Sequence, residues 1–357
     1  MSTIKSSNEH LTFNADGTSK EIRFQANGTQ KASISSAGLF TSTTIDATKL
    51  TGDLPAISGA NLTGLVPTTL TATSNIGLGA NAVDSITTGD YNVGLGDNAG
   101  TAITEGSYNT AVGFDALKTN TTATGNTGFG AYALKLNTTG ADNVAVGYGA
   151  MVQNTTANNN TAVGRDALTA NTTGAYNTAV GRTALYANTT ANYNTALGAD
   201  SLQANTTAHY NVAVGYNSLK LNTTGSQNVS IGTDALRENT TASTNTAIGY
   251  NSLNQNTTGD KNVAVGALTL DANTTGGNLT AIGYESLTGN TTGFSNTAVG
   301  MYSLRSNTTA SYNTAVGENS LRYNLTAPGN TAVGFDALKT NTSGSHNTAV
   351  GSFALIA

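Results

Sequence analysis

A strict 17-residue period runs through most of this chain and restricts the folds open to it. A glycine that closes a short Asn-Thr-Ala-Val-like stretch recurs at this spacing from Gly79 to Gly351, which makes 17 copies without one insertion. Regular repeats of this kind are typical of solenoids, in which each repeat is one coil stacked on its neighbours. A compact globular enzyme does not require such constant spacing between repeats. The sequence therefore predicts an all-β fold, a β-solenoid or β-roll of 17-residue coils.

The repeat has the consensus N-[TV]-[AG]-[VIL]-G-x-x-[AS]-L-x-x-N-T-T-[GA]-x-x. Its "NTAV" part has the β-branched content of a short strand, the glycine permits a bend, and Asn-Thr-Thr is turn material. The segment after the glycine is either a second strand or a single helical turn. In the helical case the N-caps are Asp166, Asp200, Asp234 and Asp336. The residues that define one copy are Asn177, Val180, Gly181, Leu185 and Asn188.

Burial of the apolar residues is the main energetic problem for this chain. Each coil offers only two large apolar side chains, one in the strand (Val180) and one after the glycine (Leu185), beside two alanines. We expect both to lie in the core, with Asn and Thr forming ladders between coils. Two such side chains are few for a whole coil of ordered backbone. Association of several chains around a common axis would bury these apolar side chains more completely, so we favour a homotrimer. A single-chain solenoid is the alternative.

Residues 1–72 follow a different pattern from the repeats. Residues 9–43 indicate four short strands, because the turn sequences Asn14–Gly17, Asn27-Gly28 and Ala37-Gly38 separate them. Residues 49–72 contain two Leu-Thr-Gly units and two prolines, which indicates an irregular or extended connector. We therefore divide the chain into a small β region at 1–48 for attachment or initiation, a connector at 49–72, and the repeats at 73–357, the last of them incomplete.

Composition argues against several classes of function. Only 10% of the residues are charged, far below the ~25% usual for soluble domains, which favours a structural role outside the cell or in a virion. The absence of cysteine excludes disulfides and thiolate metal sites. The net charge of −5, with scattered Lys and Arg, predicts no nucleic-acid partner. No apolar stretch is long enough for membrane insertion, and the N-terminus has no apolar segment typical of a signal peptide.

Two stretches resemble known families. Residues 4–43, followed by LTGDLPAISGANLTGL from Leu50, resemble the N-terminal part of tail-fibre-like structural proteins of marine tailed bacteriophages. The "NTAVGxxAL" core, as at Asn177–Leu185, is similar to the head repeats of trimeric autotransporter adhesins. The second resemblance implies a trimeric left-handed β-roll that binds surfaces. The repeat is longer here than in those heads, with "NTT" as the addition. The stalk and anchor of those adhesins and the tip region of tail fibres are missing from this sequence.

Candidate contact residues are few. Tyrosines recur before the strand and after the glycine, where aromatic rings could stack on sugars of a host glycan, but we favour packing between neighbouring coils or chains as their role. These possible surface contacts are Tyr176, Tyr193, Tyr210, Tyr216, Tyr250 and Tyr284. The Asn-Thr-Thr units fit the N-glycosylation sequon, but a turn that needs Asn and Thr at one coil position explains them too.

No residue pattern indicates catalysis, a cofactor or a metal. His209 and His346 lie in distant coils, and Glu105, Glu238, Glu285 and Glu318 occur in different coils without an obvious partner. A glycan-cleaving site would need two carboxylates about 5–10 Å apart. We therefore expect no enzymatic activity and no cofactor.

The sequence and its resemblances lead to one functional hypothesis. We expect a structural fibre of a phage virion, a rod that contributes to adsorption on the host by many weak contacts. Its expected partners are further copies of itself, other virion or fibre proteins at the N-terminus and at the C-terminus, and a glycan or protein of the host surface. The alternatives are a bacterial or archaeal surface adhesin, a self-assembling extracellular filament, and an ice-binding solenoid. Adjacent threonines such as Thr172-Thr173 argue against the last, because they point to opposite sides of an extended chain.

Overall fold

The computed structural model describes residues 22–26, 29–34, 40–42 and 74–356. The chain divides into two units, Met1–Val66 and Pro67–Ala357. In the first unit, β1 (Ile22–Ala26), β2 (Thr29–Ile34) and β3 (Phe40–Ser42) form an antiparallel sheet in the order β1-β2-β3. Three of the four strands expected at 9–43 are thus present. The first expected strand and the connector at 49–72 lie outside the described residues.

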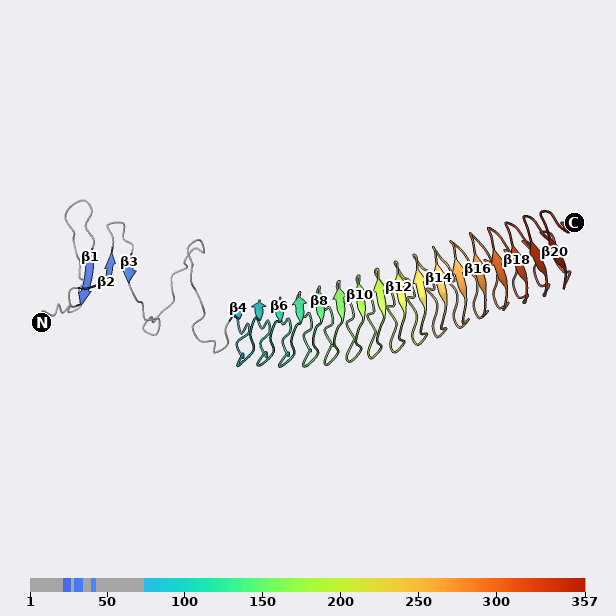
Figure 1. Ribbon diagram of the computed structural model, residues 1–357. Coiled ribbons are helices and arrows are strands. Elements are labelled where there is room, and N and C mark those ends of the chain that lie inside the picture. Colours follow the sequence, from blue (N-terminus) through green and yellow to red (C-terminus); the bar gives the residue numbers. More distant parts are fainter. Residues whose placement is uncertain (1–21, 27–28, 35–39, 43–73, 357) are drawn as a thin grey trace, which may run out of the picture. The chain divides into compact units, whose positions relative to one another are not determined.

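The second unit is a parallel β-solenoid, which confirms the fold class inferred from the 17-residue period. Each coil contributes one three-residue strand, and each strand pairs in register with its counterpart on the next coil, as Thr178, Ala179 and Val180 do with Thr195, Ala196 and Leu197. The described coils form a rod in which the strands lie along one side (Figure 1). The strands are β4 (Ile76–Leu78), β5 (Val93–Leu95), β6 (Thr110–Val112), β7 (Thr127–Phe129), β8 (Val144–Val146), β9 (Thr161–Val163), β10 (Thr178–Val180), β11 (Thr195–Leu197), β12 (Val212–Val214), β13 (Val229–Ile231), β14 (Thr246–Ile248), β15 (Val263–Val265), β16 (Thr280–Ile282), β17 (Thr297–Val299), β18 (Thr314–Val316), β19 (Thr331–Val333) and β20 (Thr348–Val350).

The glycine after each strand allows the coils to stack closely. Gly164 has a φ of 133°, a value that side-chain-bearing residues rarely adopt. A Cβ atom on it would also lie 2.5 Å from the carbonyl oxygen of Gly181 on the next coil. The period of the glycine in the sequence therefore reflects a backbone approach that recurs at every coil.

The segment after the glycine is neither a strand nor a helical turn, so both expectations for it are wrong. Every second residue is left-handed, with φ values of 56° at Asp166 and 53° at Leu168. This alternation excludes both regular structures and the N-cap role expected for the aspartates. The backbone N–H groups bond to the next coil instead, as in Leu168 N–H to Ala184 O at 2.9 Å. Described residues 74–356 contain no helix.

The core is built from smaller residues than the sequence suggested. The middle residue of each strand points inward, so Ala179 is fully buried while the expected core residue Val180 lies on the outer face and is only half-buried. The reason is the alternation of side chains along a strand, which places the flanking Thr and Val on one side and Ala on the other. Leu185 after the glycine is fully buried, as predicted. Most coils therefore bury one large apolar side chain rather than two.

Buried asparagines replace the missing apolar residues. In the turn after Leu185, the Nδ2 atom of Asn188 donates to Asn171 Oδ1 at 2.9 Å and to Ala191 O at 3.1 Å. Its own Oδ1 accepts from Asn205 Nδ2 at 3.0 Å, and the residue is fully buried. The chain of amides runs along the rod, which confirms the expectation of Asn ladders between coils. Because donors and acceptors are matched, the polar interior has little desolvation cost.

A second ladder precedes the strands. The Nδ2 atom of Asn177 donates to Ala191 O at 2.8 Å, and its Oδ1 accepts from the backbone N–H of Asn194 at 3.0 Å. Leu279 occupies this position in one coil, where it is buried and its backbone N–H still bonds to Asn262 Oδ1 at 3.0 Å. An apolar residue is therefore tolerated here when it fills the space and the backbone donor stays bonded.

Asn188→Ala should destabilise the rod strongly. The change leaves Asn171 Oδ1 without its buried donor and leaves Asn205 Nδ2 with Ala208 O as its remaining acceptor, at a cost of about 1–3 kcal/mol. We expect a lower urea midpoint in circular dichroism. Thr207→Ala, at an exposed turn position of the following coil, is the matched control and should leave the midpoint unchanged. Equal midpoints for both variants would show that the amide ladder adds no stability.

Candidate functional site

The tyrosines expected before the strands form stacks along the rod. Tyr176, Tyr193 and Tyr210 lie on three successive coils, with ring centroids 5.1 and 5.2 Å apart and planes within 5° of parallel. Tyr91 and Tyr108 stack in the same way at 5.1 Å. This stacking follows from the in-register pairing of successive coils, which places tyrosines at the same repeat position directly on top of one another. Within a stack each ring face is covered by the next ring, so the inner rings present edges and hydroxyls rather than platforms for a sugar.

The tyrosines expected after the glycine are exposed but are not stacked on one another. Tyr216 and Tyr250 are 51% and 55% exposed, and Tyr284 is 42% exposed. They occur in alternate coils, so no two of them are adjacent. Tyr284 instead meets Tyr302 of the next coil edge to face at 5.7 Å. In each repeat the strand lies between the tyrosine position of the stacked row and the tyrosine position after the glycine. The two expected groups of tyrosines therefore do not form one site.

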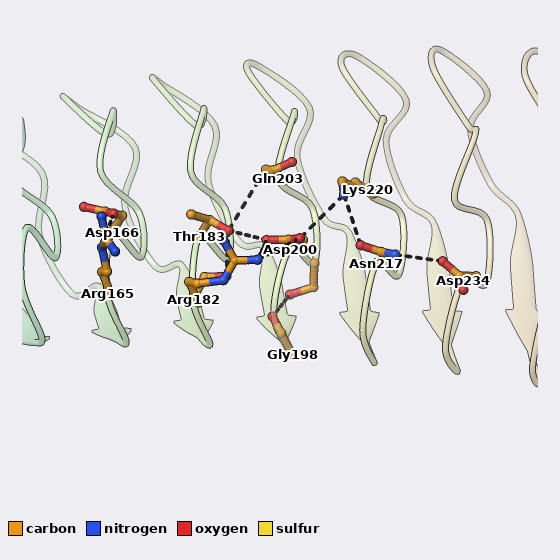
Figure 2. Close-up of polar contacts among 11 residues, drawn as sticks. Arg165, Asp166, Arg182, Thr183, Gly198, Asp200, Gln203, Asn217, Lys220 and Asp234 are labelled. Carbon is orange, nitrogen blue, oxygen red and sulfur yellow. Dashed lines mark hydrogen bonds and ion pairs between the residues drawn. The ribbon is translucent and has the colours of Figure 1, made fainter.

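A row of polar and charged side chains, which we did not expect, follows the strands at the second residue after most of the repeat glycines. Asp200 is buried and receives Arg182 Nη2 at 3.1 Å and Lys220 Nζ at 3.5 Å from the two adjacent coils. The Thr183 hydroxyl also donates to it. The row continues through Asn217, whose Nδ2 donates to Asp234 Oδ1 at 2.9 Å (Figure 2). Carboxylates, amides and cations thus link four consecutive coils.

The neighbouring cations keep these carboxylates ionised. Burial opposes ionisation of Asp200, but the Thr183 hydroxyl and the two cations outweigh it, so the pKa of this carboxyl is below its ordinary value. Asp115 repeats the arrangement: Lys118 and Lys135 each lie 3.1 Å away, and the pKa is again lowered against the effect of burial. Asp115 and Asp200 therefore bridge adjacent coils, and their negative charges are paired with the neighbouring Lys and Arg side chains.

The other expected features occupy structural positions. The sequon asparagines Asn171, Asn188 and Asn205 are fully buried, and their Nδ2 atoms are committed to the ladder, so the folded rod does not expose them for glycosylation. His209 accepts a backbone hydrogen bond from Asn192 through Nδ1 at 2.9 Å. In residues 74–356, no three His, Cys, Asp or Glu side chains gather as a metal site would require.

Comparison with known proteins gives no relative. No protein-family model matches the chain, and no curated protein and no solved structure matches it either. Among the described residues there is no helix of the length and hydrophobicity that a membrane span requires.

Sequence reasoning named Asp166, Asp200, Asp234 and Asp336 only as N-caps of a helical turn and missed their pairing with cations of adjacent coils. The signal was present: Asp, Asn, Glu or Thr recurs two residues after the glycine, and Lys or Arg recurs three residues later in several coils. Only the stacking of coils shows that a cation such as Lys220 reaches the preceding coil's Asp200.

Asp200→Asn should weaken the rod at neutral pH. A carboxyl whose pKa is lowered on folding adds stability above its unfolded pKa, about 4, and loses it as pH falls through the folded value. We expect a loss of about 1–2 kcal/mol at pH 7 in urea unfolding, shrinking towards zero near pH 2. The exposed Asp84→Asn should show no such loss. A stability difference independent of pH would contradict this assignment.

Proposed function

We propose that this protein is a structural fibre of a tailed-phage virion and that its rod contributes to adsorption on the host. The observation that carries the proposal is the uninterrupted register of 17 coils, which gives a regular array of identical backbone turns with variable outer side chains. At ~4.8 Å per coil the array is about 80 Å long. The resemblance of residues 4–43 to tail-fibre-like proteins supports the virion setting, and the β1–β3 sheet is a suitable attachment element.

We propose further that three chains associate through the outer face of the strands. The third residue of each strand is apolar and points outward, where Leu197 is 47%, Ile231 39% and Ile282 40% exposed. These side chains continue from coil to coil, and a continuous apolar face is typical of an interaction surface. Packing of three such faces around one axis would bury the Val, Leu and Ile residues that the single chain leaves in water.

The mass in solution tests the association. We expect light scattering on a sizing column to give three times the chain mass of 36.0 kDa. Ile231→Lys places a charge on the apolar face and should lower the mass to one chain, whereas Thr190→Lys, on an exposed turn, should not. A single-chain mass for the unaltered protein would overturn the trimer.

Competition tests the adsorption role. Purified protein, added in excess to the bacteria that the parent phage infects, should slow phage adsorption because it occupies the same surface contacts. Antibody raised against the rod should label the appendages of purified particles in electron microscopy. Label on uninfected cells instead would favour the surface-adhesin alternative, and unchanged adsorption kinetics would contradict a role in attachment.

Ice binding is the second candidate, because the strand face has the regularity that it requires. The outward residues alternate along each strand, with Thr or Val first and an apolar residue third, as in Thr178 and Val180. The adjacent threonines of the turns, which argued against ice binding, are therefore not the relevant ones. Thermal hysteresis in a nanolitre osmometer, together with a single-chain mass, would establish this function in place of the fibre.

A further inference from the structure

Three consecutive coils near the C-terminal end carry a row of cations. Arg305, Arg322 and Lys339 each stand five residues after the coil glycine, and each is therefore stacked on the next at the spacing of one coil. Such a row repels itself unless carboxylates are interleaved with it. The charged row two residues after the glycine could supply them, as it does around Asp200.

The carboxylates reach only the two outer members of this row. Arg305 Nε lies 2.6 Å from Glu285 Oε2, and Lys339 Nζ lies 2.9 Å from Asp336 Oδ2. The corresponding positions beside Arg322 are the neutral Tyr302 and Asn319.

Arg322 consequently has no carboxylate within 4.0 Å, whereas Arg165, Arg182, Arg237 and Arg305, the other arginines of residues 74–356, each form an ion pair. Its Nη1 donates to Asn319 Oδ1 at 3.1 Å, and its Nε is buried without a partner.

Aromatic rings hold the unpaired guanidinium in place. Its Cζ atom lies 4.7 Å from the ring centre of Tyr302 and 5.3 Å from that of Tyr323. Arg305 packs on Tyr302 as well, at 5.4 Å. Tyr323 remains 40% exposed, beside Leu325 at 49%. A guanidinium without a direct ion pair, packed against two rings, therefore adjoins an accessible aromatic ring.

We propose that Arg322 and Tyr323 form a binding site for the carboxylated sugars of an acidic polysaccharide. The sugar carboxylate takes the place that an Asp or Glu occupies beside the other arginines and accepts hydrogen bonds from the guanidinium. The apolar face of the sugar ring packs on Tyr323. The inference deepens the proposed function, on which it rests for its biological setting, by naming the surface chemistry that the fibre recognises.

Affinity electrophoresis of the purified full chain tests the site. Native gels containing polygalacturonate should retard the unaltered protein, and gels containing the neutral polysaccharide mannan should not. Arg322→Gln removes the charge and should weaken the retardation by about tenfold or more. Arg322→Lys keeps the charge but loses the planar fork, and an intermediate loss is expected. Tyr323→Ala should also bind more weakly.

Arg165→Gln is the matched control, because Arg165 packs over the Tyr148 ring at 5.9 Å but is paired with Asp166. It should bind like the unaltered protein. No retardation by polygalacturonate, equal retardation by mannan, or equal loss in the Arg165 and Arg322 variants would overturn the site.

The phage competition assay separates this inference from the proposed function. If the Arg322→Gln variant slows adsorption as well as the unaltered protein does, the proposed function stands and the proposed binding site is overturned. If the protein binds polygalacturonate through Arg322 but never slows adsorption, the binding site stands and the proposed function is overturned.

Discussion

Register between successive coils is the constraint on which the rest of this structure depends. Each coil repeats the previous one, so strand, turn and side-chain hydrogen bonds all connect a residue to its counterpart in the next coil. The asparagine ladders belong to the same system, with Asn188 bonded to Asn171 on one side and Asn205 on the other. An insertion of a single amino acid would move every later side chain out of this alignment. This explains why 17 copies occur without one.

The register also determines what the interior can contain. The coil is so narrow that one leucine and a few alanines fill it, and the remaining inward positions are occupied by amides that bond along the rod. Left-handed residues such as Asp166 and Leu168 are unfavourable individually, but their N–H groups bond to the adjacent coils and the leucine is fully buried. Hydrogen bonding between coils thus compensates for a conformation that an isolated turn would not adopt.

On the outside, the same stacking places identical or similar side chains one coil apart. Aromatic residues benefit, because rings such as Tyr176 and Tyr193 stack face to face. Charged residues do not, and most cations are therefore bridged by a carboxylate, as Lys135 is by Asp115. Arg322 departs from this arrangement. A departure within a strict repeat is informative because the fold does not require it.

The sequence by itself determined the solenoid, its period, the bend at each glycine and the burial of Leu185, because these follow from spacing and local preference. It did not determine which strand residues face inward, and Val180 was assigned to the core in place of Ala179. Only the tertiary structure decided that the segment around Asp166 and Leu168 is a turn in which left-handed residues alternate with right-handed ones. The physical reason is that its hydrogen bonds go to neighbouring coils, and a partner a whole coil away has no influence on local sequence propensities. The same reason hid the pairing of charges between coils, and with it the unpaired Arg322.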